Sequence, residues 1–129
     1  DSGRFFCGYK RWHLIGLELG MSVANVGLRG ETTGTAEEFR ADVVAVAKRD
    51  LSAGEMLDGE GGYTVAGQLR PSAVSVPMGA LPLGLTGNVK VKKAVKADTI
   101  LTYDDVVLDD TLTAVKLRKS AQERWAKSQ

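Results

Sequence analysis

A nine-residue pattern occurs twice in the chain, and its repetition restricts the fold more than any other feature of the sequence. Arg49–Leu57 (RDLSAGEML) matches Lys93–Leu101 (KAVKADTIL) at a constant offset of 44 residues. Each copy follows an apolar run typical of a strand, Val43–Ala47 or Val89–Val91, and each ends in two apolar residues. The repetition predicts two related strand-turn-strand units, with chance similarity between short apolar segments as the alternative.

Gly54 and Asp98 occupy the same place at the centre of the two copies. Glycine has no Cβ and takes a positive φ without a steric penalty, and aspartate is among the residues that tolerate this conformation next best. We therefore expect a tight turn with a positive φ at both residues.

The stretch 49–63 (RDLSAGEMLDGEGGY) also suggests a phosphate-binding loop, because such loops are rich in glycine. A dinucleotide fingerprint needs Gly-x-Gly-x-x-Gly before a helix, but Gly59 and Gly61 are followed by Thr64 in the third place. The residues that follow are largely β-branched and aromatic, which favours a strand. The chain also lacks the Gly-Lys-Ser or Gly-Lys-Thr of a P-loop, so turns are the favoured interpretation.

Composition restricts the function classes. A chain of 129 residues predicts one domain with its own core, and a net charge of +1 gives no electrostatic case for binding nucleic acid or a membrane. The single cysteine, Cys7, excludes an internal disulfide, suits a reducing compartment and is favoured as a structural residue rather than a nucleophile. No apolar run has membrane-spanning length and no signal-peptide layout is present, so we expect a soluble, cytoplasmic protein.

Three zones follow one another along the chain: residues 1–40 with helical patterns, residues 41–110 with β patterns, and residues 111–129 with a helical pattern. The chain opens at Asp1 and soon enters the apolar, aromatic stretch Phe5–Tyr9, whereas natural termini are usually polar. We therefore expect this sequence to be a piece of a longer protein.

The first zone predicts two short helices. Gly20 ends the first, and the second runs from Ser22 to Arg29 with Gly30 as its stop. The apolar face of the first helix consists of Trp12, Ile15 and Leu19.

The middle zone predicts short strands at residues 42–48, 63–69, 73–76 and 89–92. In the last of these, valine and lysine alternate, so the valines should face inward and the lysines outward. The four lysines between residues 90 and 96 suggest an anion site, but lysines on a solvated strand that discourage edge pairing are the favoured explanation. Thr102–Asp105 has capping-box spacing and predicts a single helical turn.

The last zone predicts a helix that packs on its own domain rather than on a partner. Asp109 and Asp110 lie at its amino end, where the helix dipole favours negative charge. Its apolar face consists of Leu117, Ala121 and Trp125.

Three segments, VVAVAKRDLSAGEMLDGEGGYTVAG, LPLGL and VKVKKAVKADTILTYDDVVLDD, resemble the SAF domain. This is the β-clip module also found in type III antifreeze proteins and at the C-terminus of sialic acid synthases. The resemblance implies a mainly β fold: a SAF/β-clip domain with short N-terminal helices and a C-terminal helix.

Taken with YKRWHLIGLELGMSVANVGLRGETTGT, these segments resemble the C-terminal part of homoserine dehydrogenase-like NAD(P)-dependent oxidoreductases, some of them described as similar to deoxyxylulose-phosphate reductoisomerase. In that family an N-terminal Rossmann domain binds NAD(P) and a following domain carries much of the chemistry. The resemblance implies that residues 1–40 are a junction to missing Rossmann and catalytic domains, and that this chain binds no cofactor and catalyses nothing alone. It also implies a small-molecule substrate and a possible homo-oligomer.

The resemblance points to Lys10, Arg11 and His13 as site residues, because the family pattern at this junction is approximately Arg-Pro-Tyr-His-Leu. His13 and Leu14 match it, Trp12 replaces the tyrosine, Arg11 stands where proline is usual, and Lys10 keeps only the charge of the arginine. His13 and Lys10 are then the catalytic candidates, and Lys10 and Arg11 would bind a phosphorylated or carboxylated substrate. The alternative for His13 is a structural histidine on an amphipathic helix.

Other titratable residues offer less. Glu18 follows His13 by five residues, too far along a helix for a tight pair. The pairs Asp104–Asp105 and Asp109–Asp110 are adjacent and point apart on any regular element, and one histidine with one cysteine predicts no metal site.

Two other functions remain open beside the oxidoreductase module. One is a stand-alone β-clip binding module in which the surface around Gly59–Tyr63 and Leu81–Leu85 holds a small carbohydrate or peptide. The other is a purely structural domain. The sequence does not identify the substrate, the choice between NAD and NADP, or the oligomeric state.

Overall fold

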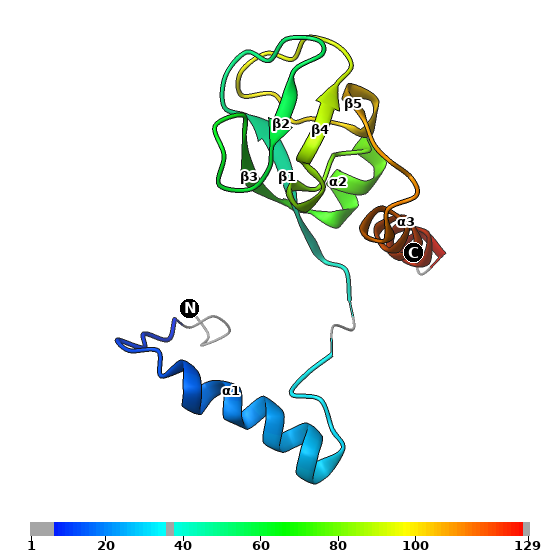
Figure 1. The fold of residues 1–129 in the computed structure, drawn as a ribbon. Coiled ribbons are helices and arrows are strands. Elements are labelled where there is room, and N and C mark those ends of the chain that lie inside the picture. The colour runs from blue at the N-terminus through cyan, green and yellow to red at the C-terminus, as the bar shows by residue number, and fades with distance from the viewer. Residues whose placement is uncertain (1–6, 36–37, 128–129) are drawn as a thin grey trace. The chain divides into compact units, whose positions relative to one another are not determined.

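The computed structural model describes residues 7–35 and 38–127, and the chain divides into two units, residues 1–37 and 38–129 (Figure 1). The larger unit contains every strand of the described residues. Its strands are β1 (Ala41–Ala47), β2 (Met56–Asp58), β3 (Val65–Pro71), β4 (Gly87–Val91) and β5 (Val106–Val107). Its helices are α2 (Ser72–Met78), α3 (Thr113–Lys127) and the 3₁₀ turns η2 (Leu83–Leu85) and η3 (Tyr103–Asp105).

The smaller unit holds one continuous helical segment. α1 (Ile15–Ala24) runs directly into η1 (Asn25–Arg29), a π-helical stretch that ends at Gly30 with φ 67°. Gly30 is the predicted stop, but the predicted break at Gly20 is wrong. One glycine inside a helix costs only about 1 kcal/mol relative to alanine, which the surrounding turns tolerate.

The strands form two antiparallel sheets. β1 pairs with β3 over their full lengths, while β4 pairs with β2 on one side and β5 on the other. Strands were therefore predicted correctly for β1 and β4, and the stretch 63–69 contains most of β3.

The repeat is confirmed by pairing between its two copies. Leu51 and Val95 occupy the same place in the two copies, and each donates its N–H to the other's carbonyl, at 2.8 Å and 3.0 Å. The corners match as well, because the Gly54 N–H donates to the Val91 carbonyl at 2.8 Å. In the other copy, the Asp98 N–H makes the equivalent bond to the Ala47 carbonyl at 2.9 Å. Asp98 lies 44 residues after Gly54, and Ala47 lies 44 residues before Val91.

Both corners have the expected backbone, with φ 86° at Gly54 and 61° at Asp98. The two copies of the repeat therefore pair with each other and are related by an approximate two-fold axis. Each copy turns at the residue for which a positive φ was predicted.

The core lies between the two sheets and consists of aliphatic side chains. Val89 and Val91 are buried while Lys90 and Lys92 are exposed, as the alternation predicts. Among the described residues, the largest fully buried aliphatic side chains are Leu51, Leu57, Leu81, Leu101, Val44, Val65, Val91, Val106 and Val115.

Residues 73–76 do not form the predicted strand but lie in α2. Tertiary contacts override the alternating pattern, since the Ser72 N–H donates to the Arg40 carbonyl at 3.0 Å and the Ser75 hydroxyl donates to Asp42 at 3.1 Å. Pro77 cannot donate an N–H to the carbonyl four residues earlier, and α2 ends one residue later, at Met78.

The single turn η3 has the predicted capping box, in which the Thr102 and Asp105 side chains and backbone bond reciprocally. α3 packs on its own unit, as expected, but the predicted face is correct only at Trp125, because Leu117 is 66% exposed and Ala121 is exposed as well. The face that packs inward consists of Val115, Arg118, Gln122 and Trp125. A charged residue at its centre explains the error, since a pattern based on hydrophobicity places arginine outside.

Candidate functional site

The sequence-predicted site residues lie just before α1. The Lys10 ammonium forms an ion pair with the Glu18 carboxylate, whose other oxygen lies 3.3 Å from His13 Nδ1. The Arg11 guanidinium lies 5.0 Å from the centre of the Trp12 ring. The fold therefore brings Lys10 and His13 together at the Glu18 carboxylate. Arg11 does not join them and contacts the Trp12 ring instead.

The expectation that Glu18 is too far from His13 is wrong. It assumed that both residues share a helix, but α1 begins only at Ile15, and Leu14 before it has the non-helical angles φ −94° and ψ 76°. His13 therefore turns back over the first turn of the helix, where Glu18 also lies. A carboxylate in the first turn preceded by basic residues was the signal for this contact.

This group, Lys10, His13 and Glu18, has the components of a positioned acid or base. A carboxylate beside an imidazole fixes the orientation of the ring. The His13 side chain is 73% exposed and that of Lys10 is 58% exposed, so solvent screens both in this chain.

The glycine-rich loop 59–63 is organised by Asp58. Its carboxylate accepts the Tyr63 N–H at 2.6 Å, the Thr64 N–H at 3.1 Å, and the Thr64 hydroxyl. These donors, with the Thr64 hydroxyl first, lower the pKa of Asp58 from 3.8 to about 2. The loop is thus a set of turns around an anionic group, and that carboxylate repels the phosphates that a cradle would bind.

The stretch Leu81–Leu85 lies only partly at the surface. Leu81 is fully buried and Pro82 is buried, whereas Leu83 and Leu85 are half-buried against the core and Gly84 is exposed. This half of the expected carbohydrate or peptide surface is therefore small, while Tyr63 in the other half is 86% exposed.

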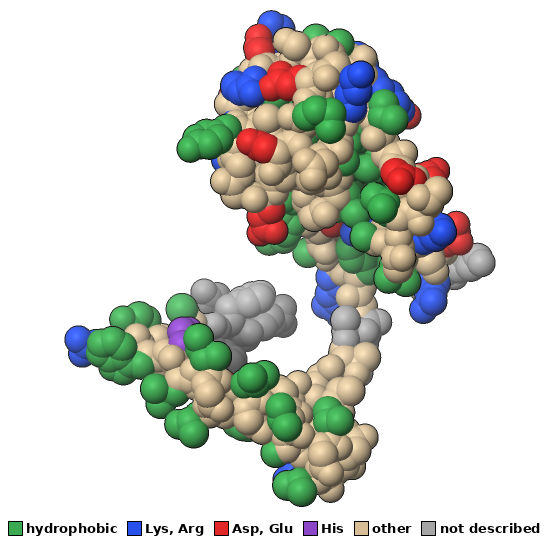
Figure 2. Space-filling model, in the orientation of Figure 1, with side chains coloured by type: hydrophobic (Ala, Val, Ile, Leu, Met, Phe, Trp, Pro, Cys, Tyr) green, Lys and Arg blue, Asp and Glu red, His purple; other side chains and the backbone are tan. Residues whose placement is uncertain are grey.

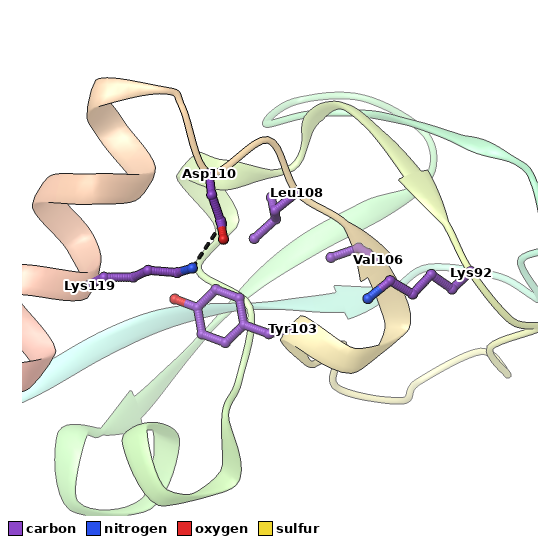
Figure 3. Close-up of a pocket in the computed structure, with 6 residues that line it drawn as sticks. All are labelled: Lys92, Tyr103, Val106, Leu108, Asp110 and Lys119. Carbon is purple, nitrogen blue, oxygen red and sulfur yellow. Dashed lines mark ion pairs between the residues drawn. The ribbon is translucent and has the colours of Figure 1, made fainter.

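A pocket of about 210 Å³ lies where α3 returns to the β body (Figure 3). We call it the α3 pocket. It is lined by Lys92, Tyr103, Val106, Leu108, Asp110 and Lys119. The sequence suggested an anion site only for the lysines between 90 and 96, and no local spacing joins Lys92 to the other lining residues, which come from separate elements.

Two further observations concern other classes of site. Across residues 7–35 and 38–127, His, Cys, Asp and Glu side chains form no group of three or more that could hold a metal ion. None of the helices in these ranges combines the length and the apolar character needed to cross a membrane.

Comparison with known proteins gives a family for the larger unit. The family model of the SAF domain matches residues 42–107, which run from β1 through β5. A search of curated proteins found no match. The matched segment contains both copies of the repeat, both positive-φ corners and the capped turn η3. With more than half of its length matched, the chain belongs to the SAF domain family.

Proposed function

We propose that this chain is the C-terminal SAF module of an NAD(P)-dependent oxidoreductase, where it completes or covers the substrate site and supports assembly. The resemblance of residues 9–35 to homoserine dehydrogenase-like enzymes suggests this role, and a cytoplasmic location accompanies it. One structural observation carries the proposal, namely the exposure of the apolar residues around α1.

The segment from Tyr9 to Leu28 exposes its large apolar side chains, while Glu18, Ser22 and Asn25 form a half-buried polar face of the helix. Ile15 is 74% exposed, Leu17 72% and Leu28 87%, and Figure 2 shows hydrophobic side chains along this helix. The other large hydrophobic residues of the segment that are exposed are Tyr9, Trp12, Leu14, Leu19, Met21, Val23 and Val26.

A helix with an apolar face usually packs that face against a core rather than leaving it in solvent. Each such side chain contributes about 1.5–3 kcal/mol when it leaves water, so this segment gains stability from a covering surface. In the proposal, that surface belongs to the catalytic part of the enzyme, and burial there also removes the solvent that screens Lys10 and His13.

The chain's own residues then have distinct roles. Lys10 and Arg11 hold an anionic group of the substrate, and His13 exchanges a proton with it. Glu18 is a positioning residue, because it contacts both Lys10 and His13. The nicotinamide supplies a hydride when bound, and the Asp58 carboxylate inside the glycine-rich loop argues for a cofactor site on another domain.

The first test is the coding sequence that precedes Asp1. A Gly-rich strand-to-helix motif there supports the oxidoreductase. A start codon or a secretion signal directly before Asp1 contradicts it and favours a stand-alone module.

The second test uses the full protein. Lys10→Ala and His13→Ala should each lower kcat by roughly 10²–10⁴-fold, the usual contribution of a positioned acid or base, while cofactor affinity stays unchanged. Lys90→Ala, an exposed lysine on β4, is the matched control and should have no effect. Wild-type rates in both site variants would remove the site assignment.

One observation favours the stand-alone binding module as a second candidate. Tyr63 is 86% exposed at the end of a loop that Asp58 holds in place, which suits an aromatic platform for a small carbohydrate or peptide. Tyr63→Ala should then abolish binding without altering the fold. Under the oxidoreductase proposal this substitution has no effect on turnover.

A further inference from the structure

The α3 pocket combines an apolar floor with charged walls. Leu108 and Tyr103 are half-buried against the core and offer apolar surface, whereas Val106 is only 1% exposed and adds almost none. At about 210 Å³, the pocket is smaller than the roughly 300–1,000 Å³ typical of sites for drug-sized ligands. Its occupant is therefore a small molecule.

The charges around the pocket do not cancel. Lys119 pairs with Asp110 at 2.8 Å, but the Lys92 ammonium forms no ion pair within the described residues. The neighbouring carboxylate of Asp105 is already held by Thr102 and by Lys93. Two lysines and one aspartate leave one uncompensated positive charge, and Figure 3 shows both lysine side chains directed toward the Tyr103 ring from opposite sides.

The Tyr103 hydroxyl is available for a new partner. Its present bond to Gln122 Oε1 is 3.5 Å long, well beyond the usual range for hydroxyl donors. A ligand oxygen between the two ammonium groups would offer a shorter, charge-assisted bond.

We propose that the α3 pocket binds a small organic monocarboxylate. The carboxylate bridges Lys92 and Lys119 and accepts the Tyr103 hydroxyl, while the apolar body rests on Leu108 and the Tyr103 ring. A monoanion matches the single excess charge. Inorganic phosphate matches less well, since it carries more charge at neutral pH and leaves the apolar floor uncovered.

The site requires the docked position of α3. Lys119 belongs to α3, and the adjacent Arg118 bonds Asp42 of β1 through both terminal nitrogens. Opening of α3 would remove one of the two cations from the pocket. Ligand binding and docking of α3 therefore stabilise each other. This inference is independent of the proposed oxidoreductase role, because every residue involved lies in the larger unit.

The test is a titration of the full chain, labelled with ¹⁵N, with benzoate, benzamide and inorganic phosphate as probes. Benzoate should shift the amide signals near Lys92, Tyr103 and Leu108 along a saturating curve. Benzamide has the same shape without the charge and should bind about tenfold more weakly, as expected for loss of a charge-assisted contact. Equal binding of benzamide, or of phosphate at the same amides, would overturn the proposal.

Single substitutions assign the effect to the pocket. Lys92→Gln and Lys119→Gln should each weaken benzoate binding by about tenfold. Lys90→Gln removes an exposed lysine two residues away on β4 and should leave binding unchanged. If all three variants bind benzoate alike, the carboxylate does not lie between Lys92 and Lys119 and the assignment fails. Unchanged amide spectra away from the substitutions verify that each variant is folded.

Discussion

At the scale of single residues, the ionisation of Asp58 makes the stability of the folded glycine-rich loop depend on pH. Hydrogen bonds from Thr64 and Tyr63 lower its folded pKa to about 2, whereas its ordinary value is 3.8. The carboxylate form is thus favoured by folding, and the stabilisation is fully present above about pH 4. It is lost as the pH falls from about 4 through 2, because the folded state must then bind a proton that the unfolded state already holds.

We predict that Asp58→Asn flattens the fall in stability over this pH range. Urea unfolding midpoints measured at several pH values between 2 and 6 test this, with Asp104→Asn as the control. Asp104 is exposed and its carboxylate accepts no hydrogen bond within the described residues. Parallel pH profiles for wild type and Asp58→Asn would show that the loop does not depend on this carboxylate.

The second prediction at this scale concerns Gly54. A Cβ added there would meet only the Lys90 side chain at 3.8 Å, an ordinary contact, so the penalty for Gly54→Ala comes from the positive φ alone. That penalty is about 1–2 kcal/mol, and reduced freedom of the unfolded chain offsets part of it. We expect a net loss of about 1 kcal/mol.

Gly84→Ala is the matched control, because Gly84 also has space for a Cβ and its φ is not positive. It should be neutral or slightly stabilising. Gly54→Asn should cost less than Gly54→Ala, since asparagine tolerates this conformation better. Chemical denaturation of the three variants measures these differences in the free energy of unfolding. If Gly54→Ala is as stable as the wild type, the turn accommodates alanine by changing its backbone conformation.

At the scale of elements, α3 is fastened by one buried ion pair. The Arg118 guanidinium bonds Asp42 in a bidentate arrangement and lies 4.8 Å from the centre of the Phe39 ring. The side chains of Arg118 and Asp42 are only 16% and 6% exposed, and the Ser75 hydroxyl also donates to Asp42. One network therefore joins α3, β1, α2 and the segment before β1.

We predict that Arg118→Ala lowers the free energy of unfolding by about 3 kcal/mol, because it leaves the Asp42 carboxylate buried without its cation. Lys119→Ala on the same helix removes an exposed ion pair with Asp110 and should cost less than about 1 kcal/mol. Urea denaturation of both variants measures the difference. If the two variants lose similar amounts of unfolding free energy, apolar contacts rather than this ion pair hold α3 in place.

The same network shows where prediction from the sequence stops. The corners at Gly54 and Asp98, the alternation in β4 and the capped turn η3 were predictable, because each depends on the chemistry of neighbouring residues. α2 and the inward face of α3 were not, because Ser75 and Arg118 find their partner in Asp42, 33 and 76 residues away. At the candidate site, the contact of His13 with Glu18 depended on where α1 begins, and local patterns predict helix ends poorly.

At the scale of the whole molecule, the two units differ in whether their apolar side chains are buried. Every buried hydrophobic residue among those described lies in the larger unit, from Val44 to Val115. The described part of the smaller unit buries none of its large hydrophobic side chains. Its described interactions are helical hydrogen bonds and exposed contacts such as the ion pair of Lys10 with Glu18, and helices of this length are marginal in water without packing.

We therefore predict that residues 38–129 unfold at the same temperature as the whole chain, within about 2 °C, since less than 1 kcal/mol of core packing is removed. The whole chain should self-associate as its concentration rises and should bind a hydrophobic dye, whereas residues 38–129 should stay monomeric and bind little dye. Calorimetry, sedimentation and dye fluorescence measure these properties. Leu17→Glu with Leu28→Glu in the whole chain is the control for length, because it should suppress self-association without changing the unfolding temperature. A marked loss of thermal stability on removal of residues 1–37 would show that the apolar helix is covered within this chain, and the case for a covering catalytic domain would then lose its support.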